Sequence, residues 1–300
     1  MGNMRVAHLL VVNARPAQVA RFARQLLVGD DTVHIHVDAK EDQAPFAAAV
    51  DPRVKLAAAR HVITWGGWNL VEATLSLLRQ ARADGDHDYY SLHSGSCYPI
   101  RPLAEFHAHL ARCRGLEFIE ACGETAGSSA FRSRHQRWWF RDHPRLRFLH
   151  HIHQYAPSRP SPPDCPLHVG STWWTLSREA IDELLDLTAR RPDLVQFFRY
   201  NDIPDEVFFP SLIMMTRRAG HVCNAKLRHV EWLSHSEHPL IMRRQHFGRL
   251  ANSPAFFARK FDASVDAEIL DRLDELLAGR LDPRWRDCAG SSRSNPVARP

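Results

Sequence analysis

Two short segments of the chain carry residue types that can do chemistry. Pro204-Asp205-Glu206 opens an apolar segment, and Phe257-Ala258-Arg259-Lys260-Phe261 sets two cations between aromatic residues. A carboxylate held at the start of a helix can act as a general base. Two cations fixed in an apolar frame can neutralise a diphosphate as a metal ion would. Together the segments predict group transfer from a nucleotide-activated donor without a metal ion.

Each of these candidates also has a plainer interpretation. An acidic residue in the first turn of a helix is favoured by the helix dipole, whatever its function, and this applies to Glu206. Arg259 and Lys260 can equally be surface cations of an amphipathic segment. Asp38 ends an apolar run at the edge where open α/β sheets bind ligands, and it can accept hydrogen bonds from a ribose or a base. It can also be a turn residue that ends the strand.

Other chemistries find weaker support. The segment Val12-Asn13-Ala14-Arg15-Pro16 lacks the glycine pattern of a dinucleotide site. Asp86-His87-Asp88 has the Asp-x-Asp pattern of metal-dependent transferases, but it precedes a predicted strand, and we interpret it as a solvated turn. His150-His151-Ile152-His153 resembles a metal site without a nearby carboxylate, so exposed histidines are the simpler interpretation. A metal-dependent hydrolase that uses these histidines stays an alternative.

Composition narrows the class of protein and its location. The chain has 300 residues, of which 44% are hydrophobic, and a net charge of +5, which suits an anionic ligand such as a nucleotide sugar. No apolar run reaches the roughly 18 residues of a membrane span. Six cysteines without a C-x-x-C pair are typical of reduced thiols, and no nucleic-acid-binding pattern is present. We expect a cytoplasmic protein and leave open a peripheral association with the inner membrane face.

Hydrophobic patterns predict an α/β chain. Residues 5–12 and 32–37 are apolar runs typical of buried strands, and residues 16–27 between them have helical spacing. A strand–helix–strand unit of this length implies a parallel sheet. Further strands are predicted at 54–57, 89–93, 116–120, 169–176 and 227–232. Further helices are predicted from Asn69, with Glu72 completing a capping box, from a Ser177 cap over 178–190, and over 204–218 and 266–277.

The domain organisation expected from these patterns is simple. Residues 1–286 are predicted to form a single domain. Within it, residues 121–166 are rich in arginine, aromatic residues and proline, and we predict an excursion over the carboxyl edge of the sheet near an acceptor site. The Ser/Pro/Arg-rich tail at 287–300 is predicted to be disordered.

An ordered set of motifs along the chain resembles a known family. The motifs are Ile35-His36-Val37-Asp38, Trp65-Gly66-Gly67, the segment YYSLHSGSCYPIRP at 89–102, Phe118-Ile119-Glu120, Gly170-Ser171-Thr172-Trp173-Trp174, Pro204-Asp205-Glu206 and the segment from Leu227 to Asp262. The set resembles the core-2/I-branching β-1,6-N-acetylglucosaminyltransferase and peptide O-xylosyltransferase family (glycosyltransferase family 14), in a bacterial-type form.

The resemblance implies a GT-A type fold, an inverting mechanism, and a UDP-sugar donor used without a metal or other cofactor. It makes Glu206 the catalytic base. It assigns the UDP and its diphosphate to Val12, Asp38, Arg259, Lys260 and an arginine that is either Arg243 or Arg244. It assigns the acceptor to Glu120, Arg134, Arg137 and Trp232.

The sequence also departs from the family pattern. Cys97 replaces the aspartate of the Ser-Gly-x-Asp-x-Pro motif. We expect no counterpart of the disulfide cysteines of secreted members or of the membrane anchor of Golgi members. We predict a glycosyltransferase that moves a sugar, first of all N-acetylglucosamine from UDP-GlcNAc, to a hydroxyl of a glycan or glycolipid. Xylosyl transfer from UDP-xylose is the alternative, because Gly170-Ser171-Thr172-Trp173 is closer to the G-S-x-W pattern of xylosyltransferases. A non-catalytic carbohydrate- or nucleotide-binding protein on the same fold is another.

Overall fold

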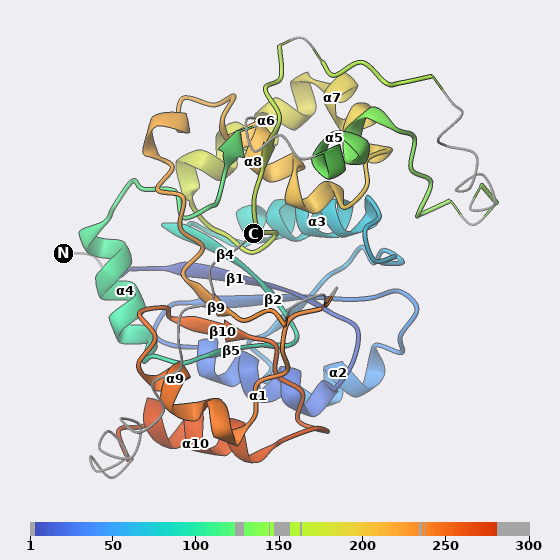
Figure 1. Ribbon diagram of the computed structural model, residues 1–300. Helices are drawn as coiled ribbons and strands as arrows, with labels where there is room; N and C mark the ends of the chain where they lie inside the picture. The colour runs from blue at the N-terminus through green and yellow to red at the C-terminus, as the bar shows by residue number, and fades with distance from the viewer. Residues whose placement is uncertain are drawn as a thin grey trace. The chain divides into compact units, whose positions relative to one another are not determined.

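The computed structural model describes residues 4–123, 129–143, 145–146, 157–162, 164–233, 236 and 238–280, with the backbone alone for 129–132. The chain folds into two compact units (Figure 1). The first consists of Met1–Gly95 and His109–Lys226, and the second of Ser96–Ala108 and Leu227–Pro300. The prediction of a single domain over 1–286 is not tested by this division, and the predicted disordered tail lies outside the described residues.

The first unit is built on a five-stranded sheet in the order β3-β2-β1-β4-β8. Its strands are β1 (Val6–Val12), β2 (Thr32–Val37), β3 (Lys55–Leu56), β4 (Tyr89–Ser94) and β8 (Thr175–Ser177). The first four strands pair in parallel, and β8 runs antiparallel to β4. The apolar, β-branched runs form these central strands because both faces of a parallel sheet are covered by helices.

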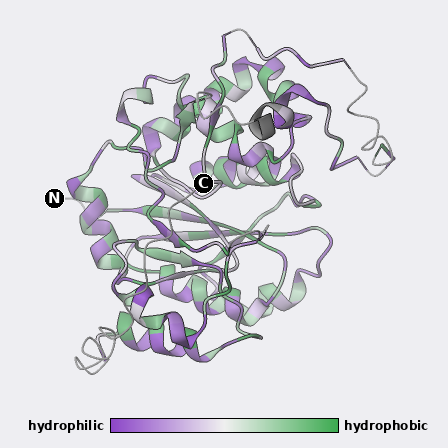
Figure 2. Cartoon of the chain, viewed as in Figure 1, coloured by the Kyte–Doolittle hydropathy of each residue, from purple (hydrophilic) through white to green (hydrophobic). Residues whose placement is uncertain are grey.

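Helices cover both faces of this sheet (Figure 1). The helices described in this unit are α1 (Pro16–Leu26), α2 (Ala44–Ala49), α3 (Asn69–Asp84), α5 (Ser129–Gln136), α6 (Arg178–Arg190), α7 (Pro192–Arg199) and α8 (Phe208–Ile213). Helix α1 lies on one face, and α3 and α6 lie on the other. Hydrophobic and hydrophilic residues alternate along these helices (Figure 2), as expected of amphipathic helices. The described residues also include the short ladder of β6 (Cys122–Gly123) with β7 (His168–Val169).

Aromatic side chains hold the candidate site against this core. Trp68, just before α3, packs edge-on against Phe208 of α8 with 5.1 Å between ring centroids. Trp174 packs against Phe209 at 5.3 Å. All four side chains are buried, and large aromatic rings contribute most of the packing energy in such a core. The segment before α8, which contains Glu206, is therefore attached to a rigid base.

The second unit has a three-stranded sheet in the order β5-β10-β9. Its elements are β5 (Cys97–Pro99), β9 (Arg228–Val230), β10 (Phe257–Arg259), α9 (Phe247–Ala251), α10 (Glu268–Leu277) and a 3-10 turn at Arg244–His246. Helix α4 (Leu103–Arg112) begins in this unit and ends in the first. Phe106 packs against Phe256 and Phe257 at 5.3 and 5.2 Å between centroids.

The predicted fold class, α/β with a central and mostly parallel sheet flanked by helices, is confirmed. The strand bounds at 32–37 and the helix at 178–190 agree with the prediction. Ser177 caps that helix by accepting a hydrogen bond from the backbone N–H of Ala180. Among the helices that the structure describes, none has the length and apolar character needed to cross a membrane.

Two predicted strands differ in the structure. Residues 116–120 make only isolated bridges, from Glu117 to Val222 and from Phe118 to Thr175. The strand predicted over 169–176 is divided into β7 and β8, because the segment between them turns toward Glu206 instead of continuing a ladder.

Two predicted helices differ from the structure in their capping or their continuity, although both begin where predicted, at Asn69 and Pro204. No capping box forms at Asn69, because its side chain donates to the carbonyl of Val62 while Glu72 accepts from the indole N–H of Trp68. The helix predicted over 204–218 is a 3-10 turn at Pro204–Glu206 followed by the short α8. Pro210 has no N–H to bond the carbonyl of Glu206, so a continuous helix loses that bond.

Buried histidines are a particular feature of the first sheet. Among the described residues, five fully buried histidines lie in or beside it, namely His8, His34, His36, His87 and His93. The hydroxyl of Thr32 lies 3.1 Å from Nε2 of His34 and 2.9 Å from Nε2 of His87. Burial lowers the pKa of His34, His36 and His87 to about 4. These rings are therefore neutral in the folded chain at neutral pH.

We expect the chain to lose stability in mild acid. Unfolded histidines take up protons near pH 6.5, whereas His34, His36 and His87 resist protonation down to about pH 4. The contribution of these three rings to the free energy of unfolding should therefore be constant above pH 6.5 and fall between pH 6.5 and 4, by at most roughly 3 kcal/mol per group. Urea unfolding at several pH values measures this.

A matched pair of variants assigns the effect. His87→Gln should flatten part of the pH dependence, and the exposed His238→Gln should leave it unchanged. A free energy of unfolding that stays constant from pH 7 to pH 4.5 contradicts the prediction.

Candidate active site

The turn that carries Glu206 starts from a strained residue. Ile203 has φ 47° and ψ 57°, in the left-handed region, which β-branched residues rarely adopt. Its N–H donates to the carbonyl of Gly66 at 3.0 Å, and Gly66 itself has φ +71°. Pro204 then fixes the backbone of the 3-10 turn. The Trp65-Gly66-Gly67 motif thus holds the entry to the turn that contains Glu206.

Glu206 forms an ion pair with a residue of the arginine-rich excursion. Nη1 of Arg134, in α5, lies 2.9 Å from Oε2 of Glu206, and both side chains are about one-third exposed. The carbonyl of Arg134 also accepts a hydrogen bond from the N–H of Asp202 at 2.9 Å. Backbone and side chain of Arg134 are therefore both attached to the loop that leads to the Glu206 turn. The structure brings together a predicted base and a predicted acceptor residue.

Asp205, beside Glu206, is buried and hydrogen-bonded to Thr172. The hydroxyl of Thr172 donates to Oδ2 of Asp205 at 2.5 Å. Burial, and then the negative charge of Glu206, raise the pKa of Asp205 to about 7. The sequence analysis assigned Asp205 no role beyond its place in the Pro204-Asp205-Glu206 motif. The Gly-Ser-Thr-Trp-Trp motif was the available signal, since it supplies the partner.

Gly170 makes the closest backbone approach at the site. Its N–H donates to the carbonyl of Glu206 at 2.9 Å. This bond replaces the helical hydrogen bond that Pro210, which has no N–H, cannot donate. A Cβ at position 170 would lie 1.8 Å from the carbonyl oxygen of Glu120. The carboxylate of Glu120 pairs with Lys226 at 3.0 Å. Glu120 thus borders the site through its backbone, and its acceptor role stays a prediction.

Arg141 joins the excursion to the Trp65-Gly66-Gly67 turn. Its Nε lies 2.5 Å from Oδ1 of Asp202. Its guanidinium carbon lies 5.3 Å from the ring centroid of Trp65 and 5.2 Å from that of Trp139. Stacking on two rings fixes a cation that sequence reasoning counted only as part of a basic segment. Trp65 remains 58% exposed.

Asp38 and Val12 meet at the carboxyl edge of the first sheet. The N–H of Asp38 donates to the carbonyl of Val12 at 2.8 Å. Its Oδ1 accepts from the N–H groups of Lys40 and Ile63 at 3.0 and 3.2 Å, and the side chain is buried. The carboxylate therefore stabilises its own turn. The assignment of Asp38 and Val12 to the nucleoside stays a prediction.

The cationic segment of the second unit has a fixed backbone. The side chains of Phe257 and Phe261 on either side of Arg259 and Lys260 are fully buried. The N–H of Lys260 donates to the carbonyl of Leu240 at 3.4 Å, and its carbonyl accepts from Met242 at 2.8 Å. The aromatic frame predicted from the sequence is present, and the diphosphate role stays a prediction.

The remaining predicted residues lie on exposed segments. Arg244 pairs with Glu268 at 3.0 Å, which leaves the exposed Arg243 as the better of the two upstream candidates. Trp232 is 59% exposed, and Arg137 is also exposed. Cys97 is buried and stands opposite Arg259 in the antiparallel register.

Metal ligands were sought among the residues that the structure describes. No group of three or more His, Cys, Asp or Glu side chains there is placed to hold a metal ion. Asp86 pairs with Arg178 at 3.1 Å, and Asp88 pairs with Arg114 at 3.1 Å, so arginines compensate both carboxylates. The His150–His153 segment lies outside the described residues, and the hydrolase alternative is therefore not tested.

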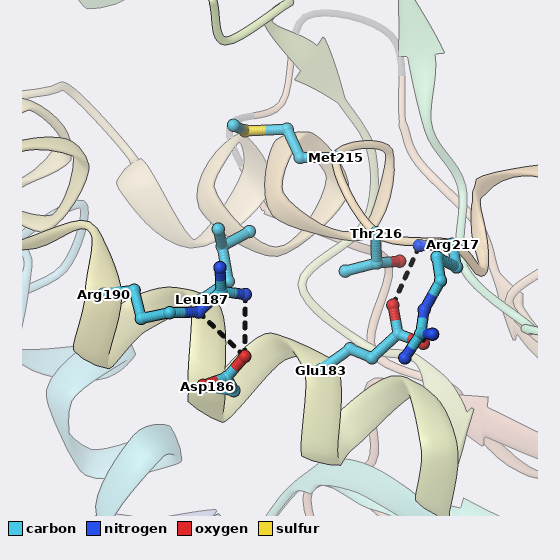
Figure 3. A pocket seen from close by; sticks show the side chains of 7 residues that line it. All are labelled: Glu183, Asp186, Leu187, Arg190, Met215, Thr216 and Arg217. Atoms are coloured by element: carbon cyan, nitrogen blue, oxygen red, sulfur yellow. Dashed lines mark hydrogen bonds and ion pairs between the residues drawn. The ribbon is translucent and has the colours of Figure 1, made fainter.

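A small pocket in the first unit contains none of the predicted residues. Its volume is about 220 Å³, and it is lined by Glu183, Asp186, Leu187, Arg190, Met215, Thr216 and Arg217 (Figure 3). Glu183 accepts from the backbone N–H of Arg217 at 2.8 Å, and Asp186 pairs with Arg190 at 2.7 Å. The charges that line the pocket are thus paired with one another.

The chain belongs to the core-2/I-branching enzyme family, whose sequence model matches residues 6–250. The predicted membership of this glycosyltransferase family is confirmed. Similar proteins include xylosyltransferase 1 of Rattus norvegicus, 28% identical over 92% of this chain and 36% of that protein. Xylosyltransferase 2 of Homo sapiens is 26% identical over 93% of this chain and 34% of its own length. The chain thus spans about a third of the length of these relatives.

A comparison with solved structures found mouse xyloside xylosyltransferase 1 in its apo form. That structure has a TM-score of 0.36 and 12% identity, and the match covers 84% of this chain and 97% of the mouse chain. A likeness at this TM-score supports no conclusion about function, so the family assignment rests on the sequence match.

Gly170→Ala should destabilise the site although it removes none of the candidate catalytic or binding side chains. The added Cβ meets backbone at 1.8 Å, so either Glu120 or the Glu206 turn must move. We expect a loss of about 3 kcal/mol or more in the free energy of unfolding. Urea denaturation measures it.

Gly220→Ala is the matched control, because a Cβ there meets no atom within 4 Å. Equal stability of the two alanine variants contradicts the close approach at Gly170.

Proposed function

We propose that the chain is an inverting, metal-independent glycosyltransferase that moves a sugar from a UDP-sugar to a hydroxyl of an acceptor. The observation that carries this proposal is the ion pair between Arg134 and Glu206. It places an anionic carboxylate, fixed by a short turn and a cation, in a chain that belongs to a glycosyltransferase family. A carboxylate that is ionised and held in a fixed position can accept the proton of an acceptor hydroxyl.

The proposed reaction is a single displacement. Glu206 takes the proton of the acceptor hydroxyl while the acceptor oxygen forms a bond to the anomeric carbon. The bond from that carbon to the diphosphate oxygen breaks, and UDP leaves with the electron pair. Arg259 and Lys260 stabilise the negative charge that grows on the leaving diphosphate. Arg134 keeps Glu206 in place and contributes to the acceptor side, with Arg137, Glu120 and Trp232.

The names of the similar proteins suggest which sugar nucleotide this chain uses as its donor. They are named xylosyltransferases, which supports UDP-xylose at least as well as the UDP-GlcNAc that we predicted first. A screen for UDP release with UDP-GlcNAc, UDP-xylose, UDP-glucose and UDP-galactose, each with oligosaccharide, glycolipid and serine-peptide acceptors, tests both. UDP binding without turnover on any pair favours the non-catalytic alternative. A cytoplasmic location with peripheral membrane association remains a proposal as well.

Glu206→Gln should keep the shape of the turn and remove the proton acceptor. Turnover should fall by roughly 10²–10⁴, the usual contribution of general-base catalysis, while the affinity for UDP changes little. Initial rates and UDP titration measure the two quantities.

Glu183→Gln, which alters a carboxylate of the surface pair with Arg217, controls for the loss of a charge. Near-normal turnover of Glu206→Gln rules out Glu206 as the base.

The double variant Arg259→Ala, Lys260→Ala should bind UDP about 10²-fold more weakly or worse, because each charge-assisted contact to phosphate contributes about 1.5–3 kcal/mol. EDTA should not change the rate of the unmodified enzyme, and Mn²⁺ should not rescue the double variant. Calorimetric UDP titration and rates with and without EDTA measure this.

Activity that EDTA abolishes and Mn²⁺ restores contradicts metal independence, and it brings Asp86 and Asp88 back as candidate ligands.

A further inference from the structure

A buried arginine lies behind the Arg134–Glu206 ion pair. Arg159 is only 5% exposed. Its Nη1 donates to the carbonyls of His135, Arg137 and Tyr200 at 3.4, 3.2 and 2.9 Å and to Oδ1 of Asn201 at 3.0 Å, and its Nη2 donates to the carbonyl of Phe197. The guanidinium also lies over the rings of Trp138 and Phe197, at 4.7 and 4.6 Å from their centroids.

All of these described hydrogen bonds end on neutral oxygen atoms. Burial of a cation costs several kcal/mol unless it is compensated. Here the compensation comes from backbone carbonyls at the C-terminal ends of α5 and α7, where the helix dipole is negative, and from two aromatic faces. Burial lowers the pKa of Arg159 to about 10, so the side chain stays charged at neutral pH. One cation thus binds both helix ends, the carbonyl of Arg137 directly after α5 and the carbonyl of Phe197 in the last turn of α7.

The segments that Arg159 binds are those that carry the two partners of the ion pair. His135 directly follows Arg134 in the chain. Tyr200 and Asn201 lie in the loop that leads to the Pro204–Glu206 turn. The backbone N–H of Arg159 also donates to the carbonyl of Gln136 at 2.8 Å. One guanidinium thus fixes the backbone beside the arginine and the backbone before the glutamate.

We infer that Arg159 is a positioning residue, which holds α5 against the 200–206 loop so that Arg134 reaches Glu206. The inference rests on the proposed function in so far as Glu206 is the base. A lysine can replace this group only in part, because a single ammonium cannot reach both the oxygens around Nη1 and the Phe197 carbonyl at Nη2, and it lacks the planar surface that lies over Trp138 and Phe197.

The kinetic test is a double-mutant cycle. Arg159→Met keeps the apolar volume against Trp138 and Phe197 and removes the charge. We expect it to lower kcat/KM about tenfold or more, with the same division between kcat and acceptor KM as Arg134→Ala. In the Arg134→Ala background, Arg159→Met should add less than about twofold. Arg159→Lys should recover only part of the loss, and Arg190→Met, which removes an exposed arginine, should change nothing.

Independent, multiplying effects of the two substitutions overturn the inference, as does wild-type activity of Arg159→Met. Arg159→Lys, taken through the same cycle, decides the question if the methionine variant does not fold.

A second measurement does not depend on catalysis. Hydrogen exchange of Arg159→Met should rise in residues 133–137 and 200–206 and stay unchanged in α3. Unchanged exchange in both segments overturns the inference that Arg159 holds α5 against the 200–206 loop. This result is decisive even when no donor supports turnover and the proposed function itself has failed.

Discussion

The candidate site in the first unit depends on one ion pair, in which Arg134 supplies a fixed positive charge to the carboxylate of Glu206. Glu206 is only one-third exposed, and Arg134 meets it at 2.9 Å from a position 72 residues earlier in the chain. A partly buried ion pair contributes to function only when both partners are held, because loose side chains lose entropy in forming it. The contacts of Asp202 and Arg159 with the backbone around Arg134 supply that restraint.

The neighbouring Asp205 affects the electrostatic environment of the Arg134–Glu206 ion pair. Burial and the charge of Glu206 raise the pKa of Asp205 to about 7, so Asp205 and Glu206 together carry less negative charge at neutral pH than two ordinary carboxylates would. Thr172 holds the buried carboxyl, and Ile203 is kept in its left-handed conformation by the hydrogen bond to Gly66. Strain and burial that would otherwise destabilise the turn are thus offset by partners from two distant motifs.

Local patterns predicted the elements well, because period and capping depend on neighbours in sequence. Ser177 and the α6 bounds are examples. They also singled out Glu206 as a candidate base, since a Pro-Asp-Glu segment can be recognised without knowing its contacts, and that role stays a prediction. The pairings that build the site were not predictable in this way. Arg159 binds oxygens 22 to 42 residues away, and its sequence context is an ordinary proline-rich loop. Pro210 did carry a usable signal, because a proline within the first turns of a long predicted helix argues against continuity.

Gly170 gives the site a constraint of a different kind. Every other amino acid places at least one carbon where the carbonyl of Glu120 already lies, so no replacement is conservative in size. A substitution at position 170 is therefore tolerated only if the Glu120 segment moves first, and the ion pair between Glu120 and Lys226 holds that segment in place. A carboxylate such as Glu206 can in principle be exchanged for a shorter acid with a rearranged turn. The position in the site least open to evolutionary change is therefore one that has no side chain.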